Sequence, residues 1–167
     1  MVCYFSVIIK KNIMRLEKDL QNIAQIAKQK EKENVAFRNY LVKQDIDKVG
    51  EIVQRLNRKI APLIDCCECG NCCMNLRPIA TDEEMSKFLN PEDIESCRYA
   101  MGFKCKYLEN KKCTNYQNRP EECRAYPPLD KEEFKDNIYS SFFNYGICPI
   151  VFNVVECLKV ELKWTGK

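Results

Sequence analysis

The chain has 167 residues, a length that suits about one ordinary domain and excludes a multi-domain assembly. Hydrophobic residues make up 46% and charged residues 31%, which is typical of a folded globular protein and excludes a disordered tail or a collagen-like fibre. The sequence holds 12 Cys and no His. Catalytic triads, His-ligated zinc hydrolases and haem with a proximal His are therefore excluded, and thiol chemistry remains.

The net charge of +3 is distributed unevenly along the chain. Residues 10–59 hold 13 basic and 7 acidic side chains, whereas the rest of the chain holds 14 basic and 17 acidic ones. The sequence therefore predicts a basic arm joined to an acidic C-terminal part. A net charge of this size does not by itself indicate a nucleic-acid partner.

The first nine residues are apolar, but no basic region precedes them and two lysines follow, which is unlike a signal peptide. No run approaches the roughly 18 consecutive apolar residues that a membrane span needs. We therefore expect a cytoplasmic protein, in which many cysteines indicate metal or redox chemistry more often than disulfides. A disulfide framework, as in intracellular proteins of hyperthermophiles, is the alternative. Because a helical pattern begins near Met14, we hypothesise that residues 1–13 are not part of the native start.

Apolar residues recur at steps of three and four between residues 13 and 63, which predicts amphipathic helices. One stripe consists of Ile13, Leu16, Leu20, Ile23 and Ala27, and a second of Val42, Ile46, Val49, Val53, Leu56, Ile60 and Leu63. The polar segment 28–34 is predicted to hold the turn of a helical hairpin, with a single bent helix as the alternative.

We predict that residues 1–64 form this amphipathic helical arm, a possible coiled coil. Its expected role is core packing or self-association, with binding of a protein partner as the alternative. No basic and aromatic pattern of a nucleic-acid interface accompanies it.

Residues 65–167 are predicted to form a second, irregular domain with short helices, so the fold is expected to be mainly α. Thr81 and Glu84 form a capping box, and Asn90 before Pro91 marks another helix start. A further helical turn is expected from Pro120. Residues 150–164 fit a helix and a strand equally well.

The segment 66–73 reads Cys-Cys-Glu-Cys-Gly-Asn-Cys-Cys and contains the motif CxxCxxCC. Two residues between cysteines let a tight turn point both sulfurs at one ion. Gly70 suits the position in such a turn where φ is positive. Because successive side chains diverge, Cys72 and Cys73 are predicted to serve two different ions or one multinuclear site.

Four more cysteines lie in sequence that is predicted to be loop. Ordering such a segment costs roughly 1 to 2 kcal/mol per residue, whereas a structural zinc ion contributes about 10 to 16 kcal/mol. We therefore predict two four-coordinate sites or one larger cluster. The predicted metal ligands are Cys66, Cys69, Cys72, Cys73, Cys105, Cys113, Cys123 and Cys148. The other cysteines, predicted to be buried apolar side chains, are Cys3, Cys67, Cys97 and Cys157.

Arg119 and Arg124 flank Cys123 in the sequence. A guanidinium beside several thiolates would offset their negative charge and donate N–H groups to sulfur. Both arginines are therefore predicted second-shell residues, with exposed surface positions as the alternative. Tyr116 and Tyr126 are expected either to pack over the cluster or to belong to the ordinary core.

Residues 66–149 resemble the YkgJ-type cysteine-cluster family, whose members are described as zinc- or iron-chelating. The resemblance is carried by CxxCxxCC at 66–73, by Ile79–Glu84, by Cys105-Lys106-Tyr107-Leu108, by the run from Cys113 to Pro127, and by Cys148-Pro149. One departure is Ile150, which follows Cys148-Pro149 where the family often has Gly. The resemblance implies a metal-bound domain and leaves the metal open.

The all-thiolate donor set suits zinc and iron–sulfur clusters alike, whereas magnesium and calcium prefer oxygen ligands. Eight thiolates divide evenly into two tetrahedral zinc sites. An iron–sulfur cluster is slightly favoured because the adjacent Cys72 and Cys73 suit a multinuclear site better.

Three functions follow as hypotheses. The first is a redox or metal-handling module. The second is a protein-lysine N-methyltransferase-like enzyme or its accessory subunit, because a related cysteine cluster occurs in flagellin lysine N-methylases; the lack of a glycine-rich cofactor loop and of a His base argues against it. The third is a zinc-stapled adaptor whose basic helical arm binds a partner.

Overall fold

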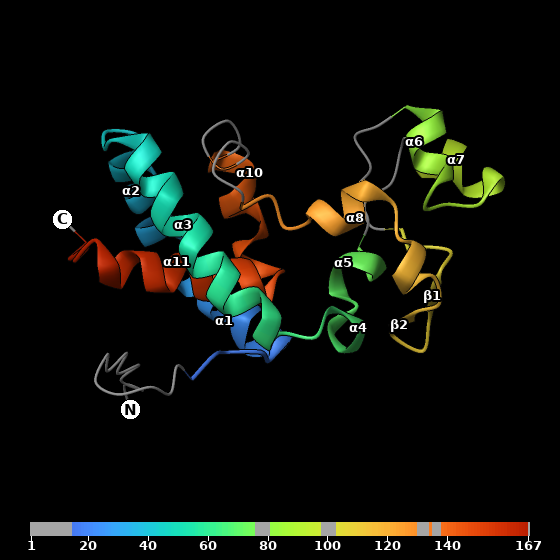
Figure 1. Cartoon of the computed structure of the whole chain (residues 1–167), viewed down its shortest axis with the longest axis horizontal. Coiled ribbons are helices and arrows are strands. Elements are labelled where there is room, and N and C mark those ends of the chain that lie inside the picture. The colour runs from blue at the N-terminus through green and yellow to red at the C-terminus, as the bar shows by residue number, and fades with distance from the viewer. Residues whose placement is uncertain (1–14, 76–80, 98–102, 130–133, 135–137, 167) are drawn as a thin grey trace. The chain divides into compact units, whose positions relative to one another are not determined.

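The computed structural model describes residues 15–75, 81–97, 103–129, 134 and 138–166 (Figure 1). The chain divides into two compact units. We call residues 1–61 with 128–167 the helical unit and residues 62–127 the cysteine unit. Regular structure in the described ranges is helical except for one two-stranded antiparallel sheet, so the prediction of a mainly α fold is confirmed.

Three helices form the N-terminal part of the helical unit. They are α1 (Leu20–Gln29), α2 (Glu31–Leu41) and α3 (Ile46–Ile60). The turn predicted within residues 28–34 differs from the structure, because helix is interrupted there only at Lys30 and α2 begins at Glu31. This polar segment contains no Gly or Pro and consists mostly of good helix formers. The longer break lies at residues 42–45, where Asp45 caps α3 by accepting a hydrogen bond from the Lys48 amide at 3.3 Å.

The C-terminal segment completes the helical unit. It contains α10 (Ile138–Phe143), η3 (Asn144–Gly146) and α11 (Pro149–Glu161). Helix α11 packs against α3, which crosses it in Figure 1, and α1 packs against η3. Val151, Val154 and Leu158 of α11 are fully buried, so the ambiguous segment 150–164 is a core helix. Residues 128–167 therefore pack with the N-terminal helices, which differs from the predicted domain boundary that placed them with the cysteines.

The second apolar stripe of the arm is buried inside this unit. Val49, Val53 and Ile60 are at most 2% exposed, whereas Val42 and Leu63 at the two ends of the stripe are more than half exposed. The first stripe contributes Ile23 to the core, and Ile13 lies outside the described residues, as does the possible start at Met14. Most of the predicted seam thus packs against the chain's own helices.

A charged network ties α2 to α11. Lys159 is 5% exposed, and its Nζ donates hydrogen bonds to Glu33 at 2.7 Å, Asn34 at 2.6 Å and Glu156 at 2.8 Å. Glu156 also pairs with Lys30 and accepts a hydrogen bond from the Tyr145 hydroxyl at 2.8 Å. Burial opposes ionisation of Glu156, but the two lysines outweigh it and lower the pKa of its carboxyl.

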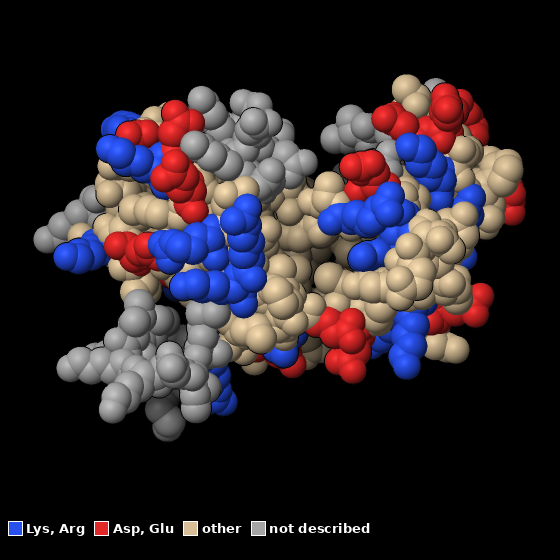
Figure 2. Space-filling model, in the orientation of Figure 1, with Lys and Arg blue, Asp and Glu red and all other residues tan. Residues whose placement is uncertain are grey.

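Four basic side chains of the arm lie on α3. This helix carries Lys48, Arg55, Arg58 and Lys59, and Figure 2 shows Lys and Arg side chains collected over it. Two of these charges are partly offset, because Lys48 pairs with Asp45 and Arg55 pairs with Glu161. Separately, none of the helices in the described ranges combines the length and the apolar character that a membrane span needs.

The cysteine unit consists of short elements. In chain order its elements are α4 (Cys66–Cys69), α5 (Asn71–Met74), α6 (Asp82–Ser86), α7 (Pro91–Cys97), β1 (Leu108–Glu109), β2 (Lys112–Cys113), η2 (Tyr116–Asn118) and α8 (Glu121–Ala125). The helix starts predicted at Thr81, Pro91 and Pro120 are confirmed, and Thr81 and Glu84 form both hydrogen bonds of the capping box. The stop predicted at Gly102 lies outside the described residues.

The apolar core of the cysteine unit is small. Met85 and Leu89 are buried together, with Phe88, Ile94 and Phe103 packed partly buried against them. This cluster covers α6 and α7 but includes no residue of the CxxCxxCC motif. Beside the motif, the described apolar packing includes Leu108, which is 3% exposed and whose Cδ1 would lie 3.5 Å from a Cβ atom at Gly70.

We predict that Glu156→Gln lowers the free energy of unfolding of the helical unit by about 2 kcal/mol at about pH 7, because a charge-assisted partner of Lys159 and Lys30 is lost. The carboxyl pKa lies below 4.5 in the folded state, so its stabilisation is present above that pH and is lost as the pH falls through the lowered pKa. Urea denaturation followed by circular dichroism should therefore show that the difference in the free energy of unfolding between the variant and the unchanged protein decreases below about pH 4.5.

The matched control is Glu161→Gln, which removes the exposed pair with Arg55. This change should cost no more than about 1 kcal/mol. Equal losses in the two variants, or a Glu156→Gln gap that does not vary with pH, would contradict the proposed role of the network.

Candidate metal centre

The CxxCxxCC motif folds as two single helical turns joined by one left-handed residue. The Asp65 carboxylate starts α4 by accepting a hydrogen bond from the Cys67 amide at 2.7 Å. Helix α4 ends at Gly70, which has φ +56°, and α5 follows immediately. The positive φ predicted for Gly70 is confirmed. The turn thereby reverses direction between the two CxxC pairs without leaving the motif.

Gly70 also brings the motif against the β1–β2 hairpin. A Cβ atom at Gly70 would lie 2.9 Å from the Lys111 carbonyl oxygen, closer than real Cβ contacts come. Asn110 and Lys111 both have positive φ and form the two-residue hairpin turn that precedes Cys113 on β2. The close approach therefore places Cys113 in the strand beside α4, and only glycine fits at this point.

A second backbone contact brings Cys105 to the end of the motif. The Cys105 amide donates a hydrogen bond to the Cys73 carbonyl at 2.7 Å, and the next amide, of Lys106, donates to Phe88 at 2.7 Å. Cys105 is 6% exposed. Its loop is thus held between the motif and the small apolar core.

Four cysteines from separate segments influence one another electrostatically. Burial raises the pKa of the Cys123 thiol to about 11, and the negative charges of Cys73, Cys105 and Cys113 contribute further to the increase. Burial also raises the pKa of Cys105, against a lowering backbone hydrogen bond from Tyr107, and Cys73 and Cys113 again add to it. Cys73, Cys105, Cys113 and Cys123 thus lie near enough to affect one another's charge, and their role as metal ligands stays a prediction.

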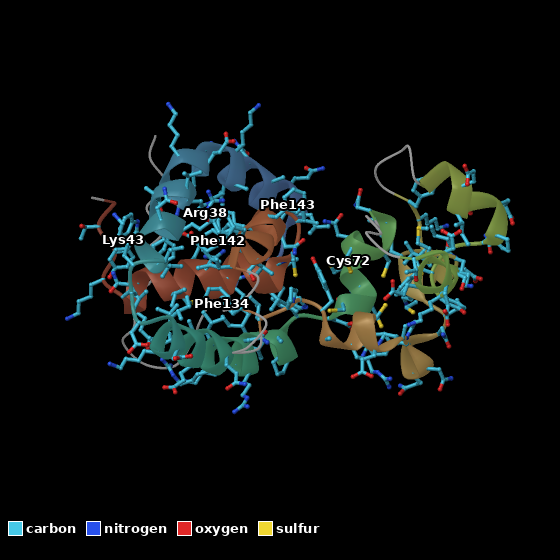
Figure 3. The ribbon with its side chains drawn as sticks, turned by 90° about the horizontal axis from the view of Figure 1, so that it is seen from above. Arg38, Lys43, Cys72, Phe134, Phe142 and Phe143 are labelled. Carbon is cyan, nitrogen blue, oxygen red and sulfur yellow. The ribbon has the colours of Figure 1, made fainter. Side chains whose placement is uncertain are left out.

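The remaining motif cysteines lie around this group. The Cys73 thiol is hydrogen-bonded to Cys72, which together with burial raises its pKa strongly. Burial raises the pKa of Cys66, and the charge of Cys69 adds to the effect. Figure 3 labels Cys72 on α5, with sulfur atoms of the cysteine unit around it.

Cys67 is the cysteine that sequence reasoning assigned differently. The sequence predicts a buried apolar side chain, and the structure shows Cys67 half-buried. Burial contributes most to the raised pKa of its thiol, the charge of Asp65 comes next, and the charges of Cys113 and Cys73 add to the increase. Cys67 is not among the predicted ligands because the CxxC spacing, counted from Cys66, selects Cys69 and Cys72. A signal was present in the capping residue, because Asp65 orients the first turn through the Cys67 amide.

Arg119 is the cation of this neighbourhood. Its guanidinium lies 3.7 Å from the ring centroid of Tyr116, and its charge lowers the pKa values of Cys66, Cys67, Cys73 and Cys123, although burial raises them on balance. The buried Nε of Arg119 has no hydrogen-bond partner. Arg124, the other predicted second-shell arginine, is exposed on α8. Arg119, stacked on Tyr116, therefore acts electrostatically on several cysteines, and Arg124 has the exposed surface position that was the alternative.

The other cysteines lie elsewhere in the chain. Cys148 belongs to the helical unit, where it is 8% exposed and immediately precedes α11. Cys157 is half-buried on α11. Cys97 ends α7, and Cys3 lies outside the described residues. The ten cysteines whose side chains are described are thiols rather than disulfides.

The donor chemistry of the cysteine unit fits a thiophilic metal, since its gathered ligands are sulfur and the chain has no His. Within the described ranges, no three Cys, Asp or Glu side chains converge closely enough to hold an ion. Metal binding therefore requires the thiols to close in and to lose their protons, which couples metal affinity to pH and to the order of the unit.

We predict that Gly70→Ala destabilises the cysteine unit by about 1 to 3 kcal/mol, because alanine is strained at positive φ and its Cβ would meet the Lys111 carbonyl. Amide hydrogen exchange of α4, α5 and the hairpin measures the effect. Gly166→Ala is the matched control, since Gly166 has φ +79° with nothing within 4 Å of an added Cβ. If exchange around the motif is equally slow in both variants, the close approach of Gly70 to the hairpin does not stabilise the unit.

Comparison with known proteins adds one match. Residues 65–140 match a family model, CxxCxxCC, described as a putative zinc- or iron-chelating domain. The match begins at the cap of α4, includes the cysteine unit from that point on, and ends before Cys148. Neither a curated protein nor a solved structure matches the chain. The segment 65–140 is therefore similar to the CxxCxxCC domain, which is described as zinc- or iron-chelating.

Proposed function

We propose that this protein binds iron or zinc through the thiolates of its cysteine unit and acts as a cytoplasmic redox or metal-handling module. The observation that carries the proposal is the gathering of Cys73, Cys105, Cys113 and Cys123 beside one cation, Arg119. These four thiols come from four separate segments of a unit whose described apolar cluster is small, and metal binding by sulfur explains why they share a neighbourhood.

These four thiols are the proposed inner set, because backbone contacts hold the segments of Cys73, Cys105 and Cys113 together and Cys123 is influenced by the charges of all three. Cys66, Cys69 and Cys72 are the proposed outer set, with Cys67 as an additional candidate. Four thiolates complete one tetrahedral site, and the outer set would supply a second ion or extend a multinuclear cluster. Cys148, which lies in the helical unit, stays a predicted ligand.

The choice between metals rests on the adjacent Cys72 and Cys73. Their hydrogen-bonded side chains begin at neighbouring backbone positions, so both can reach one multinuclear site more easily than one mononuclear site. An iron–sulfur cluster is therefore the favoured form of the proposal. Bound metal would supply redox capacity or a transferable ion, while the chain supplies the thiolates and the compensating guanidinium.

We expect protein purified without oxygen to be brown and to contain iron and acid-labile sulfide. Metal analysis and an absorption spectrum on the same sample measure this. Colourless protein with about two zinc ions per chain would instead support a zinc-stapled adaptor. Protein that binds neither metal would refute the proposal.

Cysteine variants test the ligand set in the same measurement. Cys123→Ser should lower the metal content, since it removes a thiol of the inner set. Cys157→Ser is the matched control, because Cys157 is also half-buried but lies on α11 of the helical unit. Loss of metal in both variants, or in neither, would contradict the proposed ligands.

Arg119→Gln should weaken metal binding about tenfold, because the thiolates lose their compensating charge and a donor of N–H groups. Competition with a chelator measures the affinity. Arg124→Gln, on the same short segment but exposed, should leave it unchanged. Equal affinities of the two variants would show that Arg119 has no role in compensating the thiolates.

A further inference from the structure

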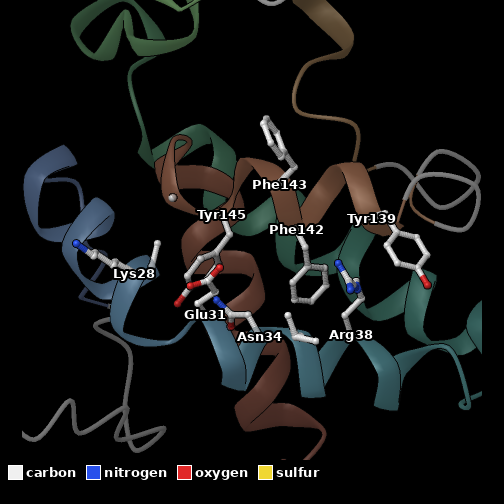
Figure 4. A pocket seen from close by; sticks show the side chains of 11 residues that line it. Lys28, Glu31, Asn34, Arg38, Tyr139, Phe142, Phe143 and Tyr145 are labelled. Carbon is white, nitrogen blue, oxygen red and sulfur yellow. The ribbon is translucent and has the colours of Figure 1, made fainter.

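A pocket of about 470 Å³ lies in the helical unit, between the α1–α2 segment on one side and α10 with η3 on the other (Figure 4). All of its lining residues belong to this unit. The volume falls within the range of about 300 to 1,000 Å³ that is usual for small-molecule sites. None of the lining residues is a cysteine, so the pocket is separate from the proposed metal function.

The floor of the pocket is built from fixed side chains. Phe142 packs edge-on against the buried Phe37, with ring centroids 6.0 Å apart. Tyr145 is 2% exposed and is held by its hydrogen bond to Glu156 and by the ring of Phe152 at 4.9 Å. The core and the charged network thus hold this floor in place, and a ligand would not need to order it.

Arg38 stands at one end of the pocket with its charge unpaired by any described acidic side chain. Its guanidinium lies 4.4 Å from the ring centroid of Tyr139, which keeps the planar group oriented. The buried Nε of Arg38 has no hydrogen-bond partner. An arginine held in this way is suited to a planar carboxylate, which accepts two parallel hydrogen bonds from it.

The two ends of the pocket differ in charge. In Figure 4, Arg38 and Tyr139 lie on one side of the Phe142 ring, and Glu31 and Asn34 lie on the other. Lys28 also lines the pocket on the Glu31 side, so the two charges there offset each other, whereas the Arg38 side is positive. A single negative group is therefore favoured beside Arg38, with the Phe142 ring available to an apolar body next to it.

Exposed apolar side chains concentrate at the rim of this pocket. Among the described residues, Tyr139 and Phe143 are each 58% exposed and Val35 is 44% exposed, and all three line the pocket. Most other large apolar side chains of the helical unit are buried. A flat apolar ligand would cover this surface and gain about 25 cal/mol per Å² of apolar area removed from water.

We propose that this pocket binds a small organic carboxylate with a flat apolar body. The carboxylate pairs with Arg38, and the body covers Phe142 between the rim residues Val35 and Phe143. The class of ligand follows from the one unpaired guanidinium, the aromatic lining and the volume of the pocket.

The test is a titration of the full-length protein with 2-naphthoate, followed by calorimetry and by amide chemical shifts. We expect saturable binding of one molecule per chain, with shifts confined to α2, α10 and η3. The neutral analogue 2-naphthylmethanol should bind at least about tenfold more weakly, since it lacks the charge that Arg38 recognises.

Arg38→Gln should weaken 2-naphthoate binding about tenfold and leave 2-naphthylmethanol binding unchanged. Arg38→Lys keeps the positive charge over Tyr139 but loses the planar pair of guanidinium donors, so it should bind 2-naphthoate with intermediate affinity. This variant distinguishes a loss of carboxylate recognition from a loss of folding. Arg58→Gln on α3 is the matched control and should bind as the unchanged protein does, because Arg58 does not line the pocket.

Three results would overturn the proposal. The first is the absence of saturable 2-naphthoate binding. The second is equal affinity for the charged and neutral probes in the unchanged protein, which would describe an apolar groove without an anion site. The third is a set of shifts in the same residues that depends on protein concentration without any probe, which would assign the surface to a second copy of the chain.

Discussion

The cysteine unit holds several ionisable thiols close together. This proximity favours the neutral form of each thiol unless a positive charge lies beside them. Two backbone contacts impose this proximity: the approach of Gly70 to Lys111, and the hydrogen bond from Cys105 to Cys73. Neither contact involves sulfur, so the segments are brought together by the peptide chain itself. Burial and mutual repulsion then keep the thiols protonated, as the raised pKa of Cys123 shows. A bound cation reverses this balance, because it stabilises every thiolate it touches.

The two units are stabilised by different kinds of interaction. The helical unit buries a continuous set of aliphatic and aromatic side chains along α11 and satisfies its one deeply buried lysine, Lys159, with three acceptors. The cysteine unit has the small cluster around Met85 and Leu89, and the CxxCxxCC motif lies outside it. Removal of metal should therefore affect the order of the cysteine unit and spare the helical unit, whose core contains no proposed inner ligand.

Local signals in the sequence predicted local structure correctly. The capping box of Thr81 and Glu84, the helix start at Pro91 and the positive φ of Gly70 each depend on residues within a few positions of one another. The features that escaped prediction depend on distant packing. Residues 128–167 join the N-terminal helices because α11 packs against α3, a contact between segments that lie far apart in the sequence. Cys67 was assigned to the core because its neighbours across the hairpin cannot be read from spacing.

Arg119 and Arg38 have the same local arrangement, in which the guanidinium lies over a tyrosine ring. They differ in their surroundings, because cysteines lie near Arg119 and the proposed ligand pocket lies beside Arg38. Each guanidinium is stacked on a tyrosine ring, at 3.7 Å for Tyr116 and 4.4 Å for Tyr139, and each has a buried Nε without a hydrogen-bond partner. Stacking fixes the plane of the fork, so the direction of its donors is set before any acceptor binds. For Arg119 the neighbouring negative charge comes from the chain, because its guanidinium lowers the pKa values of four cysteines. For Arg38 no described acidic side chain supplies the anion, which leaves the guanidinium to the carboxylate of the proposed ligand.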